Sequence, residues 1–507
     1  MLFRTVFSRV SLSHILQTKT VIKAKQHRCM SSLLNLDNTI YALSSGYGKC
    51  GVSVIRISGE RTSDVIKKMA SGSRFPIPRK AHLTTLVNPD SGEHLDKALV
   101  LWFPAPYSFT GEDVCEFHVH GGIAVVASVF RALSSIAGLR PAIAGEYTKR
   151  AFLNGKLDLT EVEGLGDLIH AETEEQRKQA LNQMEGRLSS VVKTWSQDLL
   201  RCLAHLEALI DFGEDQHIDD GVLENISKKL TTLSQNIENH LNDKRRGERL
   251  RSGVRLAIIG EPNVGKSTLL NLITSRPAAI VSPVAGTTRD VVETTLDIDG
   301  FPVILSDTAG IRETGDLVEI EGVKRAKAKA LEADLILYII DVRGLKKLSA
   351  GIPNLRQLIS SQLSNETSSV DDEIDIVFVL NKCDLIDKEE VLNFERSLKN
   401  VGCYELISCH TGDGVDKFLR KLSQKVRELC SGDDVSAYSP SLTQERHRVH
   451  VTKCFQDINS ARSVVHTDIV IGAEYLRLAM KQLGKLTGEI GAEEILEVIF
   501  KDFCIGK

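Results

Sequence analysis

The residues with the most specific chemistry lie between Val254 and Thr268, where the sequence reads VRLAIIGEPNVGKST. A mostly apolar run up to Ile259 is typical of a buried strand, and it leads into Gly-x4-Gly-Lys-Ser and a helix-like LLNLI. Glycines in this pattern let backbone N–H groups surround phosphate oxygens, and the helix start adds a favourable dipole. Lys266 is expected to reach the β- and γ-phosphates, and Ser267 to offer its hydroxyl to Mg²⁺. The stretch therefore predicts a nucleotide site rather than an ordinary glycine-rich turn.

Four later stretches have the residue types that would complete a guanine-nucleotide site. GTTRD (residues 286–290) offers Thr288 as a second hydroxyl for Mg²⁺. DTAG (307–310) offers Asp307 to the Mg²⁺ shell and the Gly310 N–H to the γ-phosphate. NKCD (381–384) supplies Asp384, which can accept two hydrogen bonds that guanine donates and adenine cannot. With SCH (408–410) closing the base pocket, these stretches favour a GTPase over an ATPase.

A water-orienting glutamine does not follow DTAG, because Ile311 occupies that position. An apolar side chain cannot orient a water molecule, so another acid or amide must take this role. Glu313 and Glu319 are candidates by their spacing from DTAG. For each of them, a solvated surface residue is the simpler interpretation.

The elements that must position these residues alternate between strands and helices. ETTLDI and FPVILSD flank Asp299-Gly300, a preferred two-residue turn, and predict a hairpin. Apolar segments at Leu335–Asp341 and Asp375–Leu380 predict further strands, with helical stretches between them. This alternation predicts a largely parallel, doubly wound sheet over residues 251–430, with its ligand at the carboxyl ends of the strands.

Residues 37–150 combine strand and helix signals. Gly51–Gly59 and Lys97–Pro104 predict strands, whereas Asp64–Ser71 and Ile123–Ile136 predict helices. Arg56 lies among apolar neighbours on the first strand, so its charge needs an anionic partner or a ligand. An ion pair with Glu116 is the simpler of these two interpretations.

Residues 151–250 are strongly helical and predict long bundle helices, in which Thr160 and Glu163 fit a capping box. A basic cluster then precedes Val254, and a solvated linker is preferred to an RNA-binding patch. A second helical region, residues 431–507, is too short for a bundle of its own. We expect it to pack against the first, so that the nucleotide-binding domain is an insertion into a helical domain. The basic cluster that precedes Val254 consists of Lys244, Arg245, Arg246, Arg249 and Arg251.

Composition limits the function further. The 507-residue chain has a net charge of −4, so it does not coat nucleic acid electrostatically, and any RNA contact must be local or shared with a partner. Its ten cysteines are scattered, which predicts reduced thiols in a non-secreted compartment. Residues 1–36 contain basic residues but no Asp or Glu, which favours a mitochondrial presequence over a disordered basic tail. No apolar run approaches the length of a membrane span.

The motifs together resemble those of the MnmE-type (TrmE) tRNA-modification GTPases. Besides the phosphate loop, GTTRD, DTAGIRE and NKCD, the similarity includes SFTGEDV (108–114), HGG (120–122) and the terminal FCIGK. It also includes GEY (145–147) and RAFLNGKLDL (150–159), and it extends from Thr39 to Lys507. Basic residues in the leader indicate the mitochondrial branch of the family.

The resemblance implies an α/β N-terminal domain that binds folate and forms dimers, followed by a helical domain that carries an inserted Ras-like GTPase domain. The implied bounds are 1–36 for the presequence and 37–150 for the N-terminal domain. The helical domain would consist of residues 151–250 and 431–507, and the GTPase domain of residues 251–430. The implied GTP contacts are Asn263, Val264, Gly265, Lys266, Ser267, Thr268, Ser282, Thr287, Thr288, Asp307, Thr308, Ala309, Gly310, Asn381, Lys382, Asp384, Ser408 and Cys409, with Ser267 and Thr288 on Mg²⁺.

The resemblance also implies a potassium ion and a reduced folate. Asn263, Ser282, Val284 and Thr287 match the potassium ligands, and Glu319, not Glu313, matches the acid that orients the water. The folate, a 5,10-methylene- or 5-formyl-tetrahydrofolate, would contact Arg56, Glu116, Lys156 and Lys507, so ligand binding now outweighs a purely structural ion pair. Cys504 matches a cysteine proposed to act in the modification chemistry, against the alternative of a packed C-terminal residue. The implied catalytic residues are therefore Glu319, Lys266 and Cys504.

The activity implied is GTP hydrolysis coupled to modification of carbon five of the wobble uridine in mitochondrial tRNAs, an aminomethyl-type group that is taurinomethyl in animal mitochondria. Family members work as homodimers with a flavin-dependent partner of the MnmG type, here in the mitochondrial matrix and without membrane insertion. Two rival hypotheses are a ribosome-assembly or signalling GTPase without modification chemistry, and a folate-dependent transferase whose GTPase domain only regulates it.

Overall fold

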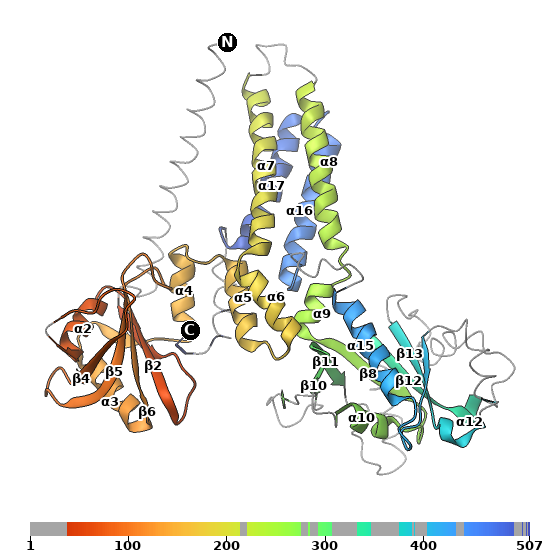
Figure 1. Cartoon of the computed structure of the whole chain (residues 1–507). Coiled ribbons are helices and arrows are strands. Elements are labelled where there is room, and N and C mark those ends of the chain that lie inside the picture. Colours follow the sequence, from red (N-terminus) through yellow and green to blue (C-terminus); the bar gives the residue numbers. More distant parts are fainter. Residues whose placement is uncertain are drawn as a thin grey trace, which may run out of the picture. The chain divides into compact units, whose positions relative to one another are not determined.

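The computed structural model describes residues 38–72, 74–212, 221–274, 282–283, 293–306, 332–345, 375–387, 390, 403–431, 441–490, 499, 503 and 505–506. The chain divides into two compact units, each described by itself (Figure 1). The N-terminal unit contains residues up to Gly166 together with those from Thr487 onward. The central unit runs from Asp167 to Leu486.

The N-terminal unit contains a seven-stranded sheet in the order β3-β4-β5-β6-β2-β1-β7. Helices α2 and α3 pack on one face, where alternate strand residues such as Ile55, Phe117 and Val100 are buried with Val129 and Leu133 of α3. The elements are β1 Thr39–Leu43, β2 Cys50–Ser58, α2 Thr62–Met69, β3 Ala70–Ser71, β4 His82–Val87, β5 His94–Phe103, β6 Val114–Gly121, α3 Ile123–Ser135, β7 Leu139–Pro141, α4 Glu146–Leu153 and the first part of α5 Leu159–His170, whose last residues belong to the central unit.

The predicted strands of this unit are confirmed as β2 and β5, and the second predicted helix as α3. The first predicted helix, α2, ends earlier than expected. Ala70 and Ser71 leave it and pair with Leu86 and Thr85 of β4 as strand β3. Strand pairing therefore replaces the last helical turn.

The C-terminal tail belongs to the N-terminal unit. Ile505 forms an isolated antiparallel bridge with Ala144, and the Ser44 hydroxyl donates to the Gly506 carbonyl at 2.9 Å. Gly506 has a φ of +98°, and a Cβ there would lie 2.1 Å from the Leu43 carbonyl oxygen. Only glycine fits here. Other residues are strained at this positive φ, and their Cβ would clash with the neighbouring strand.

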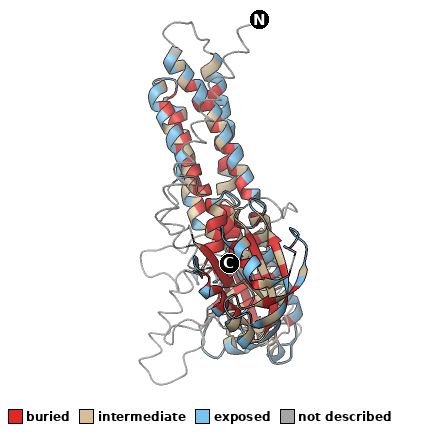
Figure 2. Ribbon diagram, turned by 90° about the vertical axis from the view of Figure 1, so that its left-hand side faces the viewer, coloured by how far each residue is buried: buried red, intermediate tan, exposed pale blue. Residues whose placement is uncertain are grey.

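The central unit contains a helical bundle with one continuous core. Buried residues of α7 and α8, such as Trp195 and Leu230, share this core with residues of α16 and α17, such as Val451 and Leu476. Figure 2 shows the buried residues running along the length of the bundle helices. The helices before and after the nucleotide-binding sheet thus form one domain, which confirms the expected insertion. The bundle elements are α6 Glu174–Met184, α7 Arg187–Phe212, α8 Gly221–Leu241, α16 Glu445–Val464 and α17 Ile469–Thr487.

The predicted capping box of α5 lies two residues too late in the chain. Asp158, not Thr160, caps the helix, because its Oδ1 accepts from the N–H groups of Thr160 and Glu161, each at 3.1 Å. The Glu161 carboxylate returns a bond by accepting from the Asp158 N–H at 2.8 Å. Thr160 is a helical residue instead.

The second sheet of the central unit has the order β14-β13-β12-β8-β11-β10-β9. Strands β14, β13, β12, β8 and β11 are parallel, whereas β10 and β9 run antiparallel to their neighbours. The predicted hairpin is confirmed, with Ile298 paired to Phe301 and positive φ values of 55° at Asp299 and 86° at Gly300. The elements are α9 Arg246–Ser252, β8 Val254–Gly260, α10 Lys266–Thr274, β9 Ser282–Pro283, β10 Glu293–Ile298, β11 Phe301–Ser306, β12 Leu335–Asp341, α12 Val342–Leu345, β13 Asp375–Asn381, η3 Cys383–Leu385, β14 Tyr404–Leu406 and α15 Val415–Ser431.

The basic cluster before β8 is not the solvated linker that we expected. Most of it forms helix α9, and three of its arginines are paired: Arg245 with Glu248 and Arg251 with Asp167, each at 2.7 Å, and Arg249 with Asp334 at 2.8 Å. These ion pairs partly neutralise Arg245, Arg249 and Arg251 within the protein. No helix within the described ranges is long and apolar enough to span a bilayer.

Candidate nucleotide site and N-terminal ligand site

The candidate nucleotide residues converge because four parallel strands end at the same edge of the sheet. Ile339 pairs with Gly260, Asp341 pairs with Asn381, and Leu380 pairs with Leu406. The loops that follow β8, β12, β13 and β14 therefore begin beside one another; Figure 1 labels the first three of these strands. This is the edge at which doubly wound sheets bind ligands.

The loop after β8 has the conformation of a phosphate cradle. Asn263 and Gly265 both have positive φ values, 63° and 106°, and α10 begins at Lys266. The Lys266 ammonium donates to the carbonyls of Gly260 and Glu261, each at 2.8 Å, and burial lowers its pKa. Phosphate oxygens can replace these carbonyls as acceptors and favour the charged ammonium. The N–H groups at the start of α10 provide further donors for an anion.

Asn381 connects three of the loops. Its buried amide donates from Nδ2 to the Val264 carbonyl at 2.7 Å, and its Oδ1 accepts from the Cys409 N–H at 3.0 Å. A Cβ on Gly265 would lie 2.3 Å from Asn381 Nδ2, so only glycine allows the phosphate loop this close to β13. The Asn381 amide therefore holds the phosphate loop and the base loop in one arrangement.

Lys382 makes a second connection between the base loop and the phosphate loop. It also contacts Asp341, which the sequence motifs did not indicate. Its ammonium donates to the Asn263 carbonyl at 2.7 Å and lies 2.9 Å from Asp341. Arg343 and Lys382 together hold the pKa of the Asp341 carboxyl well below its usual range. Asp341 ends β12, and its pairing with Asn381 in the parallel register explains why it reaches Lys382. A polar residue ending a buried strand was the only signal in the sequence.

The residues expected to surround the base follow β13 and β14. Asp384 is exposed in the short 3-10 helix η3, as a residue that accepts hydrogen bonds from a ligand should be. Ser408 is buried, and its hydroxyl accepts from the N–H groups of His410 and Thr411 at 3.3 and 3.1 Å. Burial raises the pKa of the Cys409 thiol to about 11, so this cysteine is a neutral thiol at physiological pH.

The described residues fit GTP and Mg²⁺. The loop after β8, with Ser267 in the first turn of α10, suits a phosphate chain and one hydroxyl ligand of Mg²⁺. Ser282 lies in β9, where its backbone pairs with Thr295. The remaining predicted residues lie outside the described ranges: Val284, Thr287, Thr288, Asp307, Thr308, Ala309, Gly310, Glu313, Glu319, Cys504 and Lys507. Their roles stay predictions.

The N-terminal unit brings the predicted pair Arg56 and Glu116 together on adjacent strands. Arg56 Nε donates to Glu116 Oε1 at 3.0 Å, and the guanidinium lies 5.6 Å from the Phe109 ring and 5.7 Å from the Tyr147 ring. The Arg56 side chain is 22% exposed and that of Glu116 16%. The simple ion pair is therefore present, and enough of it is accessible to contact a ligand with an aromatic ring and carboxylates.

Lys156 is held near a second loop of the same unit. Its ammonium donates to the Pro106 carbonyl at 2.9 Å, and Asn154 donates to the Thr110 carbonyl at 2.7 Å. The buried Arg150, which the motif match did not single out, donates to Glu112 at 3.0 Å. These bonds fix the 106–112 loop, whose Phe109 lies beside Arg56.

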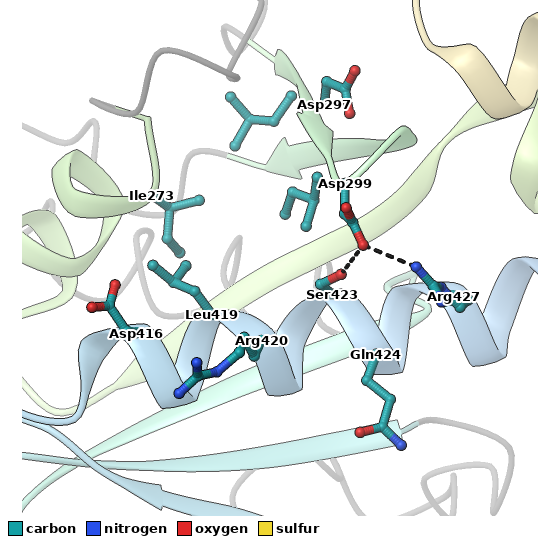
Figure 3. A pocket seen from close by; sticks show the side chains of 11 residues that line it. Ile273, Asp297, Asp299, Asp416, Leu419, Arg420, Ser423, Gln424 and Arg427 are labelled. Carbon is teal, nitrogen blue, oxygen red and sulfur yellow. Dashed lines mark hydrogen bonds and ion pairs between the residues drawn. The ribbon is translucent and has the colours of Figure 1, made fainter.

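A groove of about 650 Å³ lies between α15, the last turn of α10 and the β10–β11 hairpin (Figure 3). Ile273 of α10, Leu296 of β10 and Leu419 of α15 contribute apolar lining. At its rim the Asp299 carboxylate accepts from Ser423 at 2.9 Å and from Arg427 at 3.0 Å. None of the predicted nucleotide or folate residues lines this groove.

Comparisons with known proteins give a consistent answer. A family model described as the MnmE helical domain matches residues 159–504, and one described as the GTP-binding protein TrmE N-terminus matches residues 39–156. The chain is 50% identical over 476 residues to the 5-taurinomethyluridine-tRNA synthase subunit GTPB3, mitochondrial, of Danio rerio, covering 93% of each chain. It is 48% identical over 469 residues to the Homo sapiens protein of the same name, covering 92% of this chain and 93% of the human one. It is 44% identical over 472 residues to the tRNA modification GTPase MnmE of Paramagnetospirillum magneticum, covering 93% of this chain and 100% of the bacterial one.

Proposed function

Because the chain belongs to the MnmE (TrmE) family of tRNA-modification GTPases, we propose that it hydrolyses GTP to drive modification of the wobble uridine of mitochondrial tRNAs. We place the modification at carbon five. A taurinomethyl product is supported by the relatives of this chain that are named for 5-taurinomethyluridine. One structural observation carries the GTPase assignment. The Asn381 amide joins the phosphate loop and the base loop at the carboxyl edge of a parallel sheet.

Hydrolysis is assigned to a site completed by a potassium ion. Asn263, whose φ is positive on the phosphate loop, would supply one ligand, and Ser282, Val284 and Thr287 would supply the others. When bound, the ion neutralises charge that develops on the phosphates. Lys266 neutralises the β- and γ-phosphates, and Glu319 orients the attacking water. Glu319→Ala should keep GTP binding and lose turnover, and turnover of the parent chain should rise several-fold in K⁺ relative to Na⁺ at equal ionic strength.

The one-carbon donor is assigned to the N-terminal unit. Arg56, Glu116, Lys156 and Lys507 would hold a reduced folate, and the exposed part of the Arg56–Glu116 pair beside Phe109 and Tyr147 supports this assignment. Cys504 is assigned to the modification chemistry. The chain acts as a homodimer with a flavoprotein of the MnmG type in the mitochondrial matrix, after removal of its presequence.

The decisive experiment is mass spectrometry of nucleosides from mitochondrial tRNA in cells that lack this protein. Loss of a modified wobble uridine, with recovery on re-expression, supports the function. Re-expression of Asn381→Ala should fail to restore the nucleoside. An unchanged nucleoside profile would refute the function and favour a ribosome-assembly or signalling GTPase.

A further inference from the structure

One end of the α16–α17 hairpin collects positive charge. The two helices are antiparallel, because Arg446 donates to the Lys485 carbonyl at 3.2 Å and His450 Nδ1 lies 3.1 Å from Gln482 Oε1. Helical spacing adds Lys453 one turn after His450, and Lys481 one turn before Lys485. We name this group the hairpin cations: Arg446, His450, Lys453, Lys481 and Lys485.

The lysines of this group are not neutralised within the protein. Lys453 and Lys481 are exposed, and Lys485 is half-buried. Among the residues that the structure describes, no ion pair joins any of these three ammonium groups to a carboxylate. Their field is also felt locally. Burial lowers the pKa of His450, and the charges of Arg446, Lys485 and Lys453 lower it further.

Other cations on the same two helices have a different environment. Arg448 of α16 lies 2.6 Å from Glu248, and Arg477 of α17 lies 3.1 Å from Glu207. Pairing is therefore available to cations of the hairpin, and the three lysines lack it among the described residues. A local group of cations that lacks ion pairs attracts an anion.

We propose that the hairpin cations bind the phosphate backbone of the tRNA substrate, an inference that rests on the proposed function. The chain as a whole has a net charge of −4, so RNA contact must come from local clusters of this kind. The helical rise spreads the α16 members over about 10 Å, which spans neighbouring phosphates. Lysines are depleted at protein–protein interfaces but common at nucleic-acid backbones, which favours RNA over a protein partner. Such contacts position the tRNA without reading its sequence.

The test is the salt dependence of RNA binding by the full chain. The probe is an unmodified tRNA transcript with a wobble uridine, titrated by fluorescence anisotropy over a range of KCl concentrations. Lys453→Ala/Lys481→Ala removes two exposed ammonium groups. If both contact phosphates, the slope of log affinity against log salt should fall by about 1.5, and the affinity by about fivefold or more. GTP turnover and the unfolding midpoint should match those of the parent chain.

The matched control is Lys228→Ala/Lys229→Ala, because these two lysines are also exposed and also lie on a bundle helix, α8. It should keep the parent slope. If the hairpin variant also keeps the parent slope, the cations are a solvated face and the inference fails, while the nucleoside analysis still decides the function. If the hairpin variant binds the transcript normally but no longer co-purifies with the flavoprotein, the surface serves a protein and the inference is overturned. If the parent chain does not bind the transcript, the inference fails as well.

Discussion

The nucleotide edge of the GTPase sheet and the Arg56 site of the N-terminal unit differ in the groups that accept hydrogen bonds from their cations. At the nucleotide edge, Lys266 and Lys382 donate to loop carbonyls, so their bonds fix backbone positions, and only Lys382 also pairs with a carboxylate, that of Asp341. At the N-terminal site, Arg56 is bound to the carboxylate of Glu116, and its charge is already neutralised. The first arrangement shapes a loop for a ligand of high negative charge. The second arrangement suits a ligand that carries both polar and aromatic groups.

Removing the Asn381 hydrogen bonds that connect the nucleotide loops should have the largest effect on ligand binding. Asn381→Ala would leave the Val264 carbonyl and the Cys409 N–H without their partner. Two such buried hydrogen bonds contribute about 2–3 kcal/mol, so GTP affinity should fall about 50-fold in a fluorescent-nucleotide titration. Arg427→Ala, at the groove, is the control and should bind GTP normally. Equal affinities for both variants would contradict the framing role of Asn381.

The N-terminal site should respond independently. Arg56→Ala removes a charge-assisted contact of about 2 kcal/mol, so binding of a reduced folate measured by calorimetry should weaken about 30-fold. GTP turnover should remain unchanged. Arg131→Ala changes an exposed arginine of α3 in the same unit and serves as the control. Folate binding that survives Arg56→Ala would leave the Arg56–Glu116 pair as a structural ion pair.

Asp341→Asn should sharpen the comparison between the two sites. It removes a carboxylate from the nucleotide edge but leaves the hydrogen bonds from the lysines to the backbone carbonyls. The Lys382 ammonium would keep the Asn263 carbonyl but lose its 2.9 Å ion pair. We expect a loss of about 1 kcal/mol, or about fivefold in GTP affinity, measured by the same titration. A loss as large as that of Asn381→Ala would mean that the ion pair, and not the amide, holds the loops together.

The smallest effect is a dependence of stability on pH. The pKa of Asp341 is lowered from 3.8 by Arg343 and Lys382, so its contribution to stability is fully present above that value and is lost as pH falls through the lower, folded-state value. Urea unfolding of the parent chain and of Asp341→Asn should differ by up to about 1 kcal/mol at pH 7 and by less at pH 3. A difference that grows on acidification would show that the assigned cause of the shift is wrong.

Local patterns explain what could be predicted from the sequence. The phosphate loop, the Asp299-Gly300 hairpin and strands β8, β12 and β13 depend on neighbouring residues, and each was predicted correctly. Asp341 was missed because its partner, Lys382, is brought to it by strand pairing across the sheet. The cluster around Arg249 was misinterpreted for the same reason, since its partner Asp334 is 85 residues away. The cap of α5 was misplaced because Asp158 and Thr160 both suit an N-cap, and local geometry selects Asp158.

The C-terminal tail gives the N-terminal unit a dependence on the order of synthesis. The bond from Ser44 to Gly506 joins residues 462 positions apart, and Ile505 pairs with Ala144. Chain growth therefore produces the sheet of this unit long before the segment that completes it. Until then, the residues around Leu43 at the end of β1 and the residues near Ala144 lack these contacts. A ribosome that stalls within the GTPase domain would release a product whose first unit is unfinished, although every strand of its sheet has already been made.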